Sequence, residues 1–244
     1  MSGTLLINEI YLSLQGESTF AGWPCVFVRT TGCNLRCSYC DTAYAFGGGR
    51  RMGVEEVVAE VCNWAKRYDG AASTPRLPLV ELTGGEPLIQ PASFPLMTAL
   101  CDRGFVVLLE TSGAHDVSAV DRRVRCIVDL KGPSSGEMAR NYWPNLKQLK
   151  GSDEIKFVLG TVEDYEWMRK MMGEHDLAGV CPVLVSWVTP LAAGQQDKSL
   201  KAVPAGQRPM SRQELAERII ADGLPVRFQL QMHKFIWPAA QRGV

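Results

Sequence analysis

Short apolar runs alternate along the chain with stretches in which apolar residues recur at helical spacing. The apolar runs predict strands at 24–32, 78–87, 105–113, 125–135, 153–160, 180–188 and 225–233. Helical spacing predicts helices over 53–68, 91–104, 161–175 and 211–223. Thr161 and Ser211 stand where helix N-caps are expected, and Gly104 and Gly223 stand where two of these helices should stop. Strands that alternate with helices favour a mostly parallel sheet with crossover helices.

Polar and glycine-rich stretches follow the predicted strands at their carboxyl ends. Examples are TGGEP (83–87), ETSG (110–113) and DLKGPSS (129–135). Ligands bind at this edge of parallel α/β folds, so we expect functional residues that are distant in sequence to meet on one rim. About six strand–helix units are present, which is too few for a barrel of eight. We expect one domain over 1–244, in which the Gly-, Pro-, Gln- and Lys-rich stretch 189–210 is a loop insertion or a flap over the site.

Composition and charge narrow the class of protein. The chain has 244 residues, of which 46% are hydrophobic, so it can bury a sizeable core without disulfides. The formal net charge is zero, and overall charge therefore favours neither nucleic acid nor an anionic membrane as a partner. The N-terminal residues lack a signal-peptide pattern, and no apolar run approaches the roughly 20 residues of a membrane span. We expect a soluble cytoplasmic protein.

Three of the eight cysteines stand close together in GCNLRCSYCDT (32–42), with the spacing C-x₃-C-x₂-C. A structural zinc site takes four protein ligands, and no fourth Cys or His stands at ligand spacing. A thioredoxin-like dithiol would use CSYC (37–40) and leave Cys33 unexplained. A [4Fe–4S] cluster held by three thiolates explains all three cysteines and leaves one iron free for an external ligand. The other cysteines are expected to be buried free thiols: Cys25, Cys62, Cys101, Cys126 and Cys181.

The cysteine spacing resembles the signature of the radical S-adenosylmethionine (SAM) superfamily, and TGGEP resembles its SAM-binding GGE motif. Further stretches are similar to the 7-carboxy-7-deazaguanine synthase family: EIYLSLQGES (9–18), FVRTTGCNLRCSYCDT (27–42), LETSG (109–113), DLKGPSS (129–135) and HKFIWPAAQRGV (233–244). The resemblance implies an α/β fold, an abbreviated, partial TIM-like barrel of about six parallel strands with fewer helices. It also implies a homodimer.

The resemblance implies a lyase of queuosine and 7-deazapurine biosynthesis that uses a [4Fe–4S] cluster, SAM and Mg²⁺. The reduced cluster would cleave SAM, and the resulting radical would take a hydrogen from C6 of 6-carboxy-5,6,7,8-tetrahydropterin. Ring contraction and loss of ammonia would then give 7-carboxy-7-deazaguanine. An electron donor such as flavodoxin or ferredoxin is implied as a partner.

Roles are carried over by position in the matching motifs, and no side chain is assigned as catalytic. The cluster ligands would be Cys33, Cys37 and Cys40, and Thr42 would bind Mg²⁺. Arg29 is a charge on an otherwise apolar strand, which is costly unless a group such as a substrate carboxylate pairs with it. SAM would contact Gly85, Asp129, Leu130, Lys131, Ser134 and Ser186. The pterin would contact Leu14, Gln15, Gly16, Arg29, Thr83, Glu110, His233 and the terminal carboxylate of Val244.

Two other hypotheses remain open from the sequence. A glycyl-radical-enzyme activase also carries C-x₃-C-x₂-C on a short barrel, but it acts on a protein backbone and has no need of a pterin clamp. A zinc or redox module on an α/β core would need no enzymatic site at all. An anaerobically purified brown protein would support the cluster, whereas a colourless protein with one zinc per chain would support the module.

Overall fold

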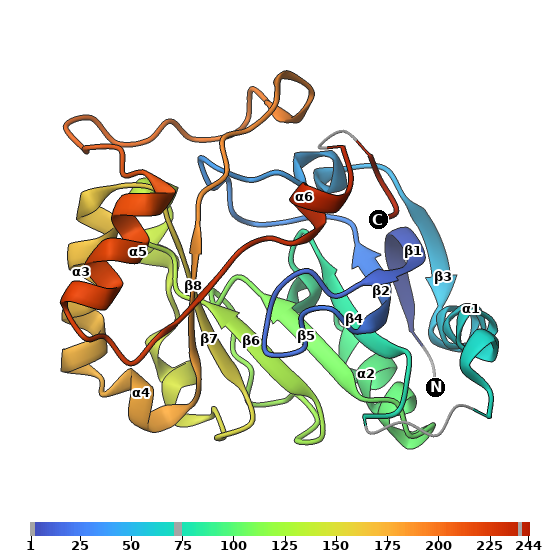
Figure 1. Cartoon of the computed structure of the whole chain (residues 1–244). Helices are drawn as coiled ribbons and strands as arrows, with labels where there is room; N and C mark the ends of the chain where they lie inside the picture. Colours follow the sequence, from blue (N-terminus) through green and yellow to red (C-terminus); the bar gives the residue numbers. More distant parts are fainter. Residues whose placement is uncertain (1–2, 71–74, 239–240) are drawn as a thin grey trace.

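The computed structural model describes residues 3–70, 75–238 and 241–244, and its centre is a nine-stranded sheet. The strand order is β3-β1-β2-β4-β5-β6-β7-β8-β9, so β3 and β9 form two open edges and the barrel is partial (Figure 1). β1 pairs antiparallel with β2 and β3, and the remaining strands run parallel from β2 to β9. The bounds are β1 Thr4–Leu14, β2 Pro24–Thr30, β3 Arg50–Gly53, β4 Leu79–Gly84, β5 Val107–Thr111, β6 Arg125–Asp129, β7 Glu154–Leu159, β8 Val183–Trp187 and β9 Arg227–Gln229.

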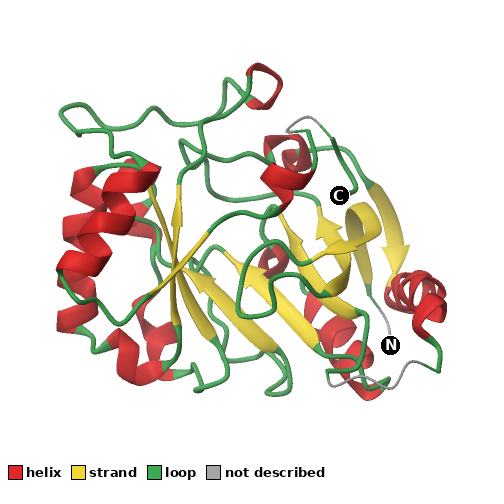
Figure 2. Cartoon of the chain, viewed as in Figure 1, coloured by secondary structure: helices red, strands yellow, loops and turns green. Residues whose placement is uncertain are grey.

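Helices cover only part of the outer face of this sheet (Figure 2). No α-helix lies between β5 and β6, and only short 3₁₀ turns lie between β6 and β7, so the prediction of a partial barrel with fewer helices is confirmed. None of the helices in the described ranges is long and apolar enough to cross a membrane. The bounds are α1 Val54–Ala65, α2 Ser93–Asp102, α3 Val162–Glu174, α4 Leu177–Val180, α5 Arg212–Ala221 and α6 His233–Ile236.

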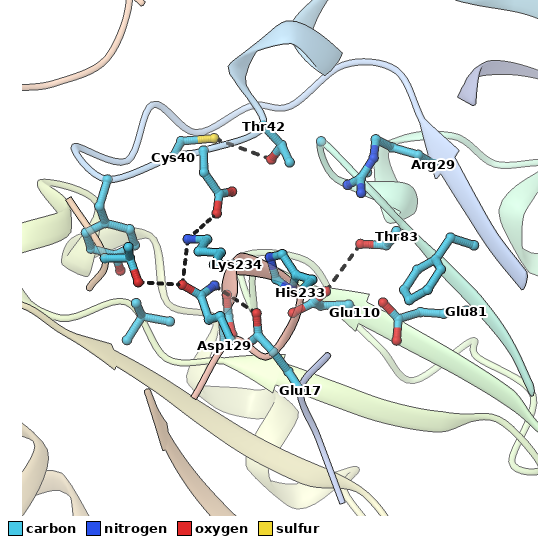
Figure 3. Close-up of a pocket in the computed structure, with 18 of the residues that line it drawn as sticks. Glu17, Arg29, Cys40, Thr42, Glu81, Thr83, Glu110, Asp129, His233 and Lys234 are labelled. Carbon is cyan, nitrogen blue, oxygen red and sulfur yellow. Dashed lines mark hydrogen bonds and ion pairs between the residues drawn. The ribbon is translucent and has the colours of Figure 1, made fainter. Parts of the chain in front are cut away.

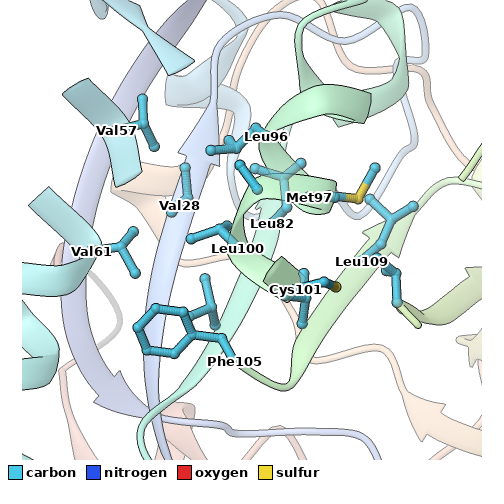
Figure 4. Close-up of a cluster of buried hydrophobic side chains, with 14 of the residues drawn as sticks. Val28, Val57, Val61, Leu82, Leu96, Met97, Leu100, Cys101, Phe105 and Leu109 are labelled. Atoms are coloured by element: carbon cyan, nitrogen blue, oxygen red, sulfur yellow. The ribbon is translucent and has the colours of Figure 1, made fainter. Parts of the chain in front are cut away.

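Two apolar clusters lie between the sheet and its helices. The first joins α1 and α2 to the outer faces of β2, β4 and β5, as Val57, Leu100 and Leu82 illustrate (Figure 4). The second joins α3 and α5 to β7 and β8, with Phe157 at its centre. Leu149 packs against both clusters, so the two cores are continuous. Alternate residues of the same strands point inward, which leaves the inner face for a site.

The structure contains two strands that the hydrophobic pattern does not predict, and the predicted strands are all shorter than expected, most of them because they end before the polar stretches that follow. β1 is half-buried because polar residues such as Asn8 and Glu9 interrupt its apolar positions, and its sequence therefore lacks a clean apolar run. β3 has only four residues. The strand expected over 225–233 ends at Gln229, and His233 begins α6 instead. The expected helix caps are present at Thr161 and Ser211, whose side chains accept from backbone N–H groups three residues on.

Residues 189–210 have little regular structure and extend from β8 beyond the carboxyl ends of the strands, as the orange segment of Figure 1 shows. The segment is anchored to the cysteine loop. The backbone N–H of Lys201 donates to Arg36 O at 2.9 Å, and Lys201 Nζ lies 2.7 Å from Gly136 O and 3.0 Å from a carboxylate oxygen of Glu137. Thr189 and Gln195 face the site. We call residues 189–210 the flap below, and their closure over the site stays a prediction.

Candidate active site

A cavity of about 270 Å³ opens at the carboxyl ends of the parallel strands, where the sequence predicts the functional rim. Figure 3 shows part of its lining, drawn from several strands and from α6. Four predicted site residues do not line the cavity: Gly16, Leu130, Ser134 and Ser186. The predicted residues that line it are Leu14, Gln15, Arg29, Cys33, Cys37, Cys40, Thr42, Thr83, Gly85, Glu110, Asp129, Lys131, His233 and Val244.

The three motif cysteines lie together on the loop that follows β2. Burial raises the pKa of each thiol, to about 11 for Cys37, and the nearby ammonium of Lys131 opposes this shift. Within the described ranges, no three His, Cys, Asp or Glu side chains converge on a point suited to one metal ion. A [4Fe–4S] cube takes each thiolate on a different iron, so its ligands need not converge. Three thiols around one cavity, with a cation beside them, fit the cluster better than zinc.

The TGGEP turn holds the cysteine loop against the sheet. A side chain at Gly85 would place its Cβ 2.0 Å from Gly32 O, so only glycine allows this approach of the two backbones. Glu86 is fully buried, and its carboxylate accepts from the hydroxyls of Thr111 and Ser112 and from the backbone N–H groups of Ser112 and Leu88. The motif therefore positions the cysteines, and contact between Gly85 and SAM stays a prediction.

Several polar groups near the cysteines have no partner within the described part of the chain, as a site for a polar cofactor would require. The hydroxyls of Tyr39, Ser134 and Ser186 are buried and form no hydrogen bond. Leu130 differs, because its side chain packs in the second apolar cluster and only its backbone could reach a ligand. Of these residues, Tyr39 lines the cavity together with the glycine turn, and both fit a polar cofactor such as SAM beside the thiols, whereas contact of Ser134 and Ser186 with SAM stays a prediction.

A buried ammonium, Lys156, joins three carboxylates across the cavity floor. Lys156 Nζ pairs with Glu110, and it lies 3.2 Å from Glu17 and 3.4 Å from Asp129. Burial alone would raise the pKa of Glu17 and of Asp129, but the lysines lower both, chiefly Lys156 for Glu17 and Lys131 for Asp129. Glu17 and Asp129 are therefore held in the ionised form, ready to accept hydrogen bonds.

Arg29 also has protein partners, which the sequence does not predict. Arg29 Nε donates to Glu9 at 2.7 Å, and Nη2 donates to the Tyr11 hydroxyl at 2.9 Å. The guanidinium still lines the cavity, so contact with a substrate carboxylate stays a prediction. Thr83 Oγ1 lies 3.3 Å from Glu110, and the two meet on the rim as expected.

The last residues of the chain form one wall of the cavity. A Cβ on Gly16 would lie 2.6 Å from His233 Nδ1, so Gly16 allows the imidazole to approach. Burial lowers the pKa of His233. The Arg242 guanidinium lies 4.1 Å from the centre of the Tyr44 ring, and Val244 follows at the cavity edge. The hydrogen-bonding partner of the Val244 carboxylate stays a prediction.

Sequence reasoning missed several charged residues of the site, chiefly Glu17, Glu81 and Lys156. Glu81 and Lys156 interrupt the apolar strands β4 and β7, as Arg29 interrupts β2. The same rule, that a charge in a buried strand needs a partner, would have found both. The pair formed by Asp41 and Lys234, with 2.6 Å between their charged atoms, links two segments and has no local signal in the sequence.

Comparisons with known proteins agree with this geometry. Residues 27–131 match the family model described as the radical SAM superfamily. The chain is 42% identical to the 7-carboxy-7-deazaguanine synthase of Chlorobaculum tepidum, over 98% of this chain and 97% of the relative. It is 44% identical to that of Koribacter versatilis, over 98% and 99%. The crystal structure of QueE from Escherichia coli superposes with a TM-score of 0.66 at 22% identity, over 94% of this chain and 95% of that one, which shows a shared fold.

Proposed function

Since the chain belongs to the 7-carboxy-7-deazaguanine synthase family of radical SAM enzymes, we propose that it converts 6-carboxy-5,6,7,8-tetrahydropterin to 7-carboxy-7-deazaguanine with loss of ammonia. The observation that carries this proposal is the meeting of two kinds of group in one cavity. Three thiols lie on one side, and carboxylates, an amide and a guanidinium lie on the other. The first side suits a cluster and SAM, and the second suits a heterocycle that bears N–H groups and a carboxylate.

On the cofactor side, Cys33, Cys37 and Cys40 would hold the [4Fe–4S] cluster. When bound, the cluster and SAM together supply the radical chemistry that removes a hydrogen atom from C6 of the substrate. The protein contributes position and shelter. Gly85 and Asp129 border the space beside the thiols. The hydroxyls of Ser134 and Ser186 are buried outside the cavity lining, and they would reach SAM only after a local rearrangement.

On the substrate side, the Glu110 side chain would accept from the aminopyrimidine N–H groups, and Arg29 would pair with the substrate carboxylate. Leu14, Gln15, Thr83, His233 and Val244 would complete the pocket. Thr189 and Gln195 of the flap line the cavity, as do Trp237 and Val244 of the tail. Water that these segments would exclude cannot react with radical species.

Mg²⁺ binding at Thr42 belongs to the proposal as well. The Thr42 hydroxyl lines the cavity 3.7 Å from the Cys40 sulfur, so it could bind a hydrated Mg²⁺ beside the substrate carboxylate. We also propose that the chain forms one domain and that two copies form a homodimer. The protein would receive electrons from an external donor of the flavodoxin or ferredoxin type and would work in the cytoplasm.

The direct test is anaerobic incubation of the reconstituted, reduced protein with SAM and the carboxytetrahydropterin, followed by mass analysis. We expect 7-carboxy-7-deazaguanine and ammonia, with Cys37→Ala as the inactive control. Turnover of a glycyl-radical enzyme in place of the pterin would favour the activase. A colourless protein with stoichiometric zinc and no turnover would favour the module.

A further inference from the structure

Glu81 lies in the middle of β4 at the floor of the cavity. Strand register places it between Phe27 of β2 and Leu108 of β5, both of which belong to an apolar cluster beneath the site. The residue is 2% exposed, and Figure 3 shows its carboxyl group directed toward the cavity below Thr83. Glu81 therefore faces the ligand space from apolar surroundings, one layer beneath the rim.

The Glu81 carboxyl group has few hydrogen-bond donors. The side-chain amide of Gln15 is the only side-chain donor to it among the described residues. The second buried glutamate of this strand–turn unit, Glu86, accepts from four donor groups. A buried carboxylate needs several donors or a cation to remain ionised, because it has lost its water. Glu81 has a single such donor and therefore does not meet that condition.

The charges that face Glu81 do not supply the missing partner. Lys156 already pairs with Glu110, Glu17 and Asp129, and the Arg29 guanidinium is bound to Glu9. Burial first, and then the neighbouring Glu110, raise the pKa of Glu81 well above its usual range. The titratable and charged groups around it are Glu110, Lys156, Glu17, Arg29, Tyr11 and Cys25.

We propose that Glu81 is a neutral carboxylic acid that positions Gln15 for the substrate. The carboxamide of Gln15 is fixed at both ends, since its nitrogen donates to Glu81 and its oxygen accepts from the backbone N–H of Glu17 at 2.8 Å. One N–H of the amide and one oxygen lone pair remain free for a ligand. A neutral Glu81 also avoids placing a second negative charge beside Glu110.

The first experiment tests the protonation state by comparing Glu81→Gln with the parent protein in thermal unfolding from pH 5 to pH 8. A glutamate in the unfolded chain ionises near pH 4.3, whereas a neutral Glu81 in the folded protein keeps its proton to a higher pH. Between these two pKa values the folded state binds one proton more than the unfolded state, so the free energy of unfolding of the parent protein falls as pH rises. The fall ends once the folded pKa is passed. We expect Glu81→Gln to gain stability over the parent protein as pH rises, and the infrared band of a protonated carboxyl group to disappear. Glu86→Gln is the matched contrast and should lose stability across the whole range. If the difference in stability between Glu81→Gln and the parent protein does not grow with pH, the proposal that Glu81 is neutral is overturned.

The second experiment tests positioning and rests on the proposed function, because its ligand is the carboxytetrahydropterin. Its dissociation constant is measured anaerobically on the SAM-loaded enzyme. We expect Glu81→Gln to stay within about threefold of the parent affinity, since a neutral carbonyl still accepts from Gln15, and Glu81→Leu to weaken binding at least tenfold. Equal losses in the two variants would overturn the neutral positioning role. If the parent protein does not bind this pterin, the proposed function fails, while the unfolding and infrared results still decide the protonation of Glu81.

Discussion

At the scale of the residue, the site depends on charged side chains that stand in buried strands. Arg29, Glu81 and Lys156 each interrupt an apolar segment and each cost free energy to bury. Two of them are compensated by ion pairs, and Glu81 is compensated by a single amide and its own proton. Side chains of this kind are retained where a ligand has to be recognised by charge and hydrogen bonds at once.

Changing Cys37 to Ala is expected to abolish iron incorporation and turnover together, because three thiolates are the minimum that hold the cube. Iron and sulfide analysis of the reconstituted protein, together with its visible absorption, measures the effect. Cys62→Ala is the matched control, since Cys62 lies on α1 within the first apolar cluster, and its iron content should not change. Full iron loading in Cys37→Ala would refute the assignment of Cys33, Cys37 and Cys40 as the cluster ligands.

Changing Arg29 to Ala is expected to raise the KM for the pterin at least tenfold and to change SAM cleavage without substrate much less. A charge-assisted bidentate contact contributes about 1.5–3 kcal/mol, which corresponds to that shift. The variant also leaves Glu9 without its cation, so Arg29→Ala with Glu9→Gln separates substrate binding from this loss. If the double variant binds the pterin with unchanged KM, Arg29 acts only through Glu9.

Much of the site could be predicted from its residues, because motif cysteines, glycines and strand-end polar groups have local signals. Gln15 and Glu110 lie where the motifs indicate. The pairing of Arg29 with Glu9 could not be predicted, since it depends on β1, a half-polar strand without a clear apolar pattern. The link between Asp41 and Lys234 joins residues almost two hundred positions apart, and only the folded chain brings them together.

At the scale of the element, the tail after β9 completes the cavity wall. It begins with α6, on which Lys234 pairs with Asp41 of the cysteine loop, and it ends with Arg242 stacked on Tyr44. The sequence indicated a docked tail because Phe235, Ile236 and Trp237 are apolar, yet Phe235 and Ile236 are exposed. Polar and cationic contacts, together with Trp237 at the cavity, hold the tail in place.

Deleting residues 242–244 is expected to weaken pterin binding severalfold and to leave iron content and far-ultraviolet circular dichroism unchanged. The deletion removes the stacking on Tyr44 and the wall formed by Gly243 and Val244, while α6 remains. A short Gly-Ser extension after Val244 is the companion variant, because it retains the wall and displaces the carboxylate. Weak binding in both variants supports the carboxylate role, and unaltered binding in the extended protein refutes it.

At the scale of the whole molecule, one continuous sheet joins two helix-covered cores, and we expect them to unfold together. Leu149 contacts both apolar clusters, so neither can lose its packing alone. Urea unfolding followed by tryptophan fluorescence and by circular dichroism should give coincident single transitions. Leu149→Ala should lower the free energy of unfolding by about 2 kcal/mol and keep one transition. Two separate transitions in the parent protein would contradict the expected single domain.

The open barrel has a consequence for how the molecule behaves when it is concentrated. A sheet that does not close presents two edges whose free backbone groups can pair with another chain and begin an aggregate. Here both terminal strands are short, since β3 has four residues and β9 has three. Exposed arginines stand on both terminal strands, namely Arg50 and Arg51 on β3 and Arg227 on β9. When a terminal strand of a second copy approaches either edge, arginine therefore meets arginine, and the like charges oppose pairing. The sheet that leaves its barrel open is thereby protected against the addition of a tenth strand.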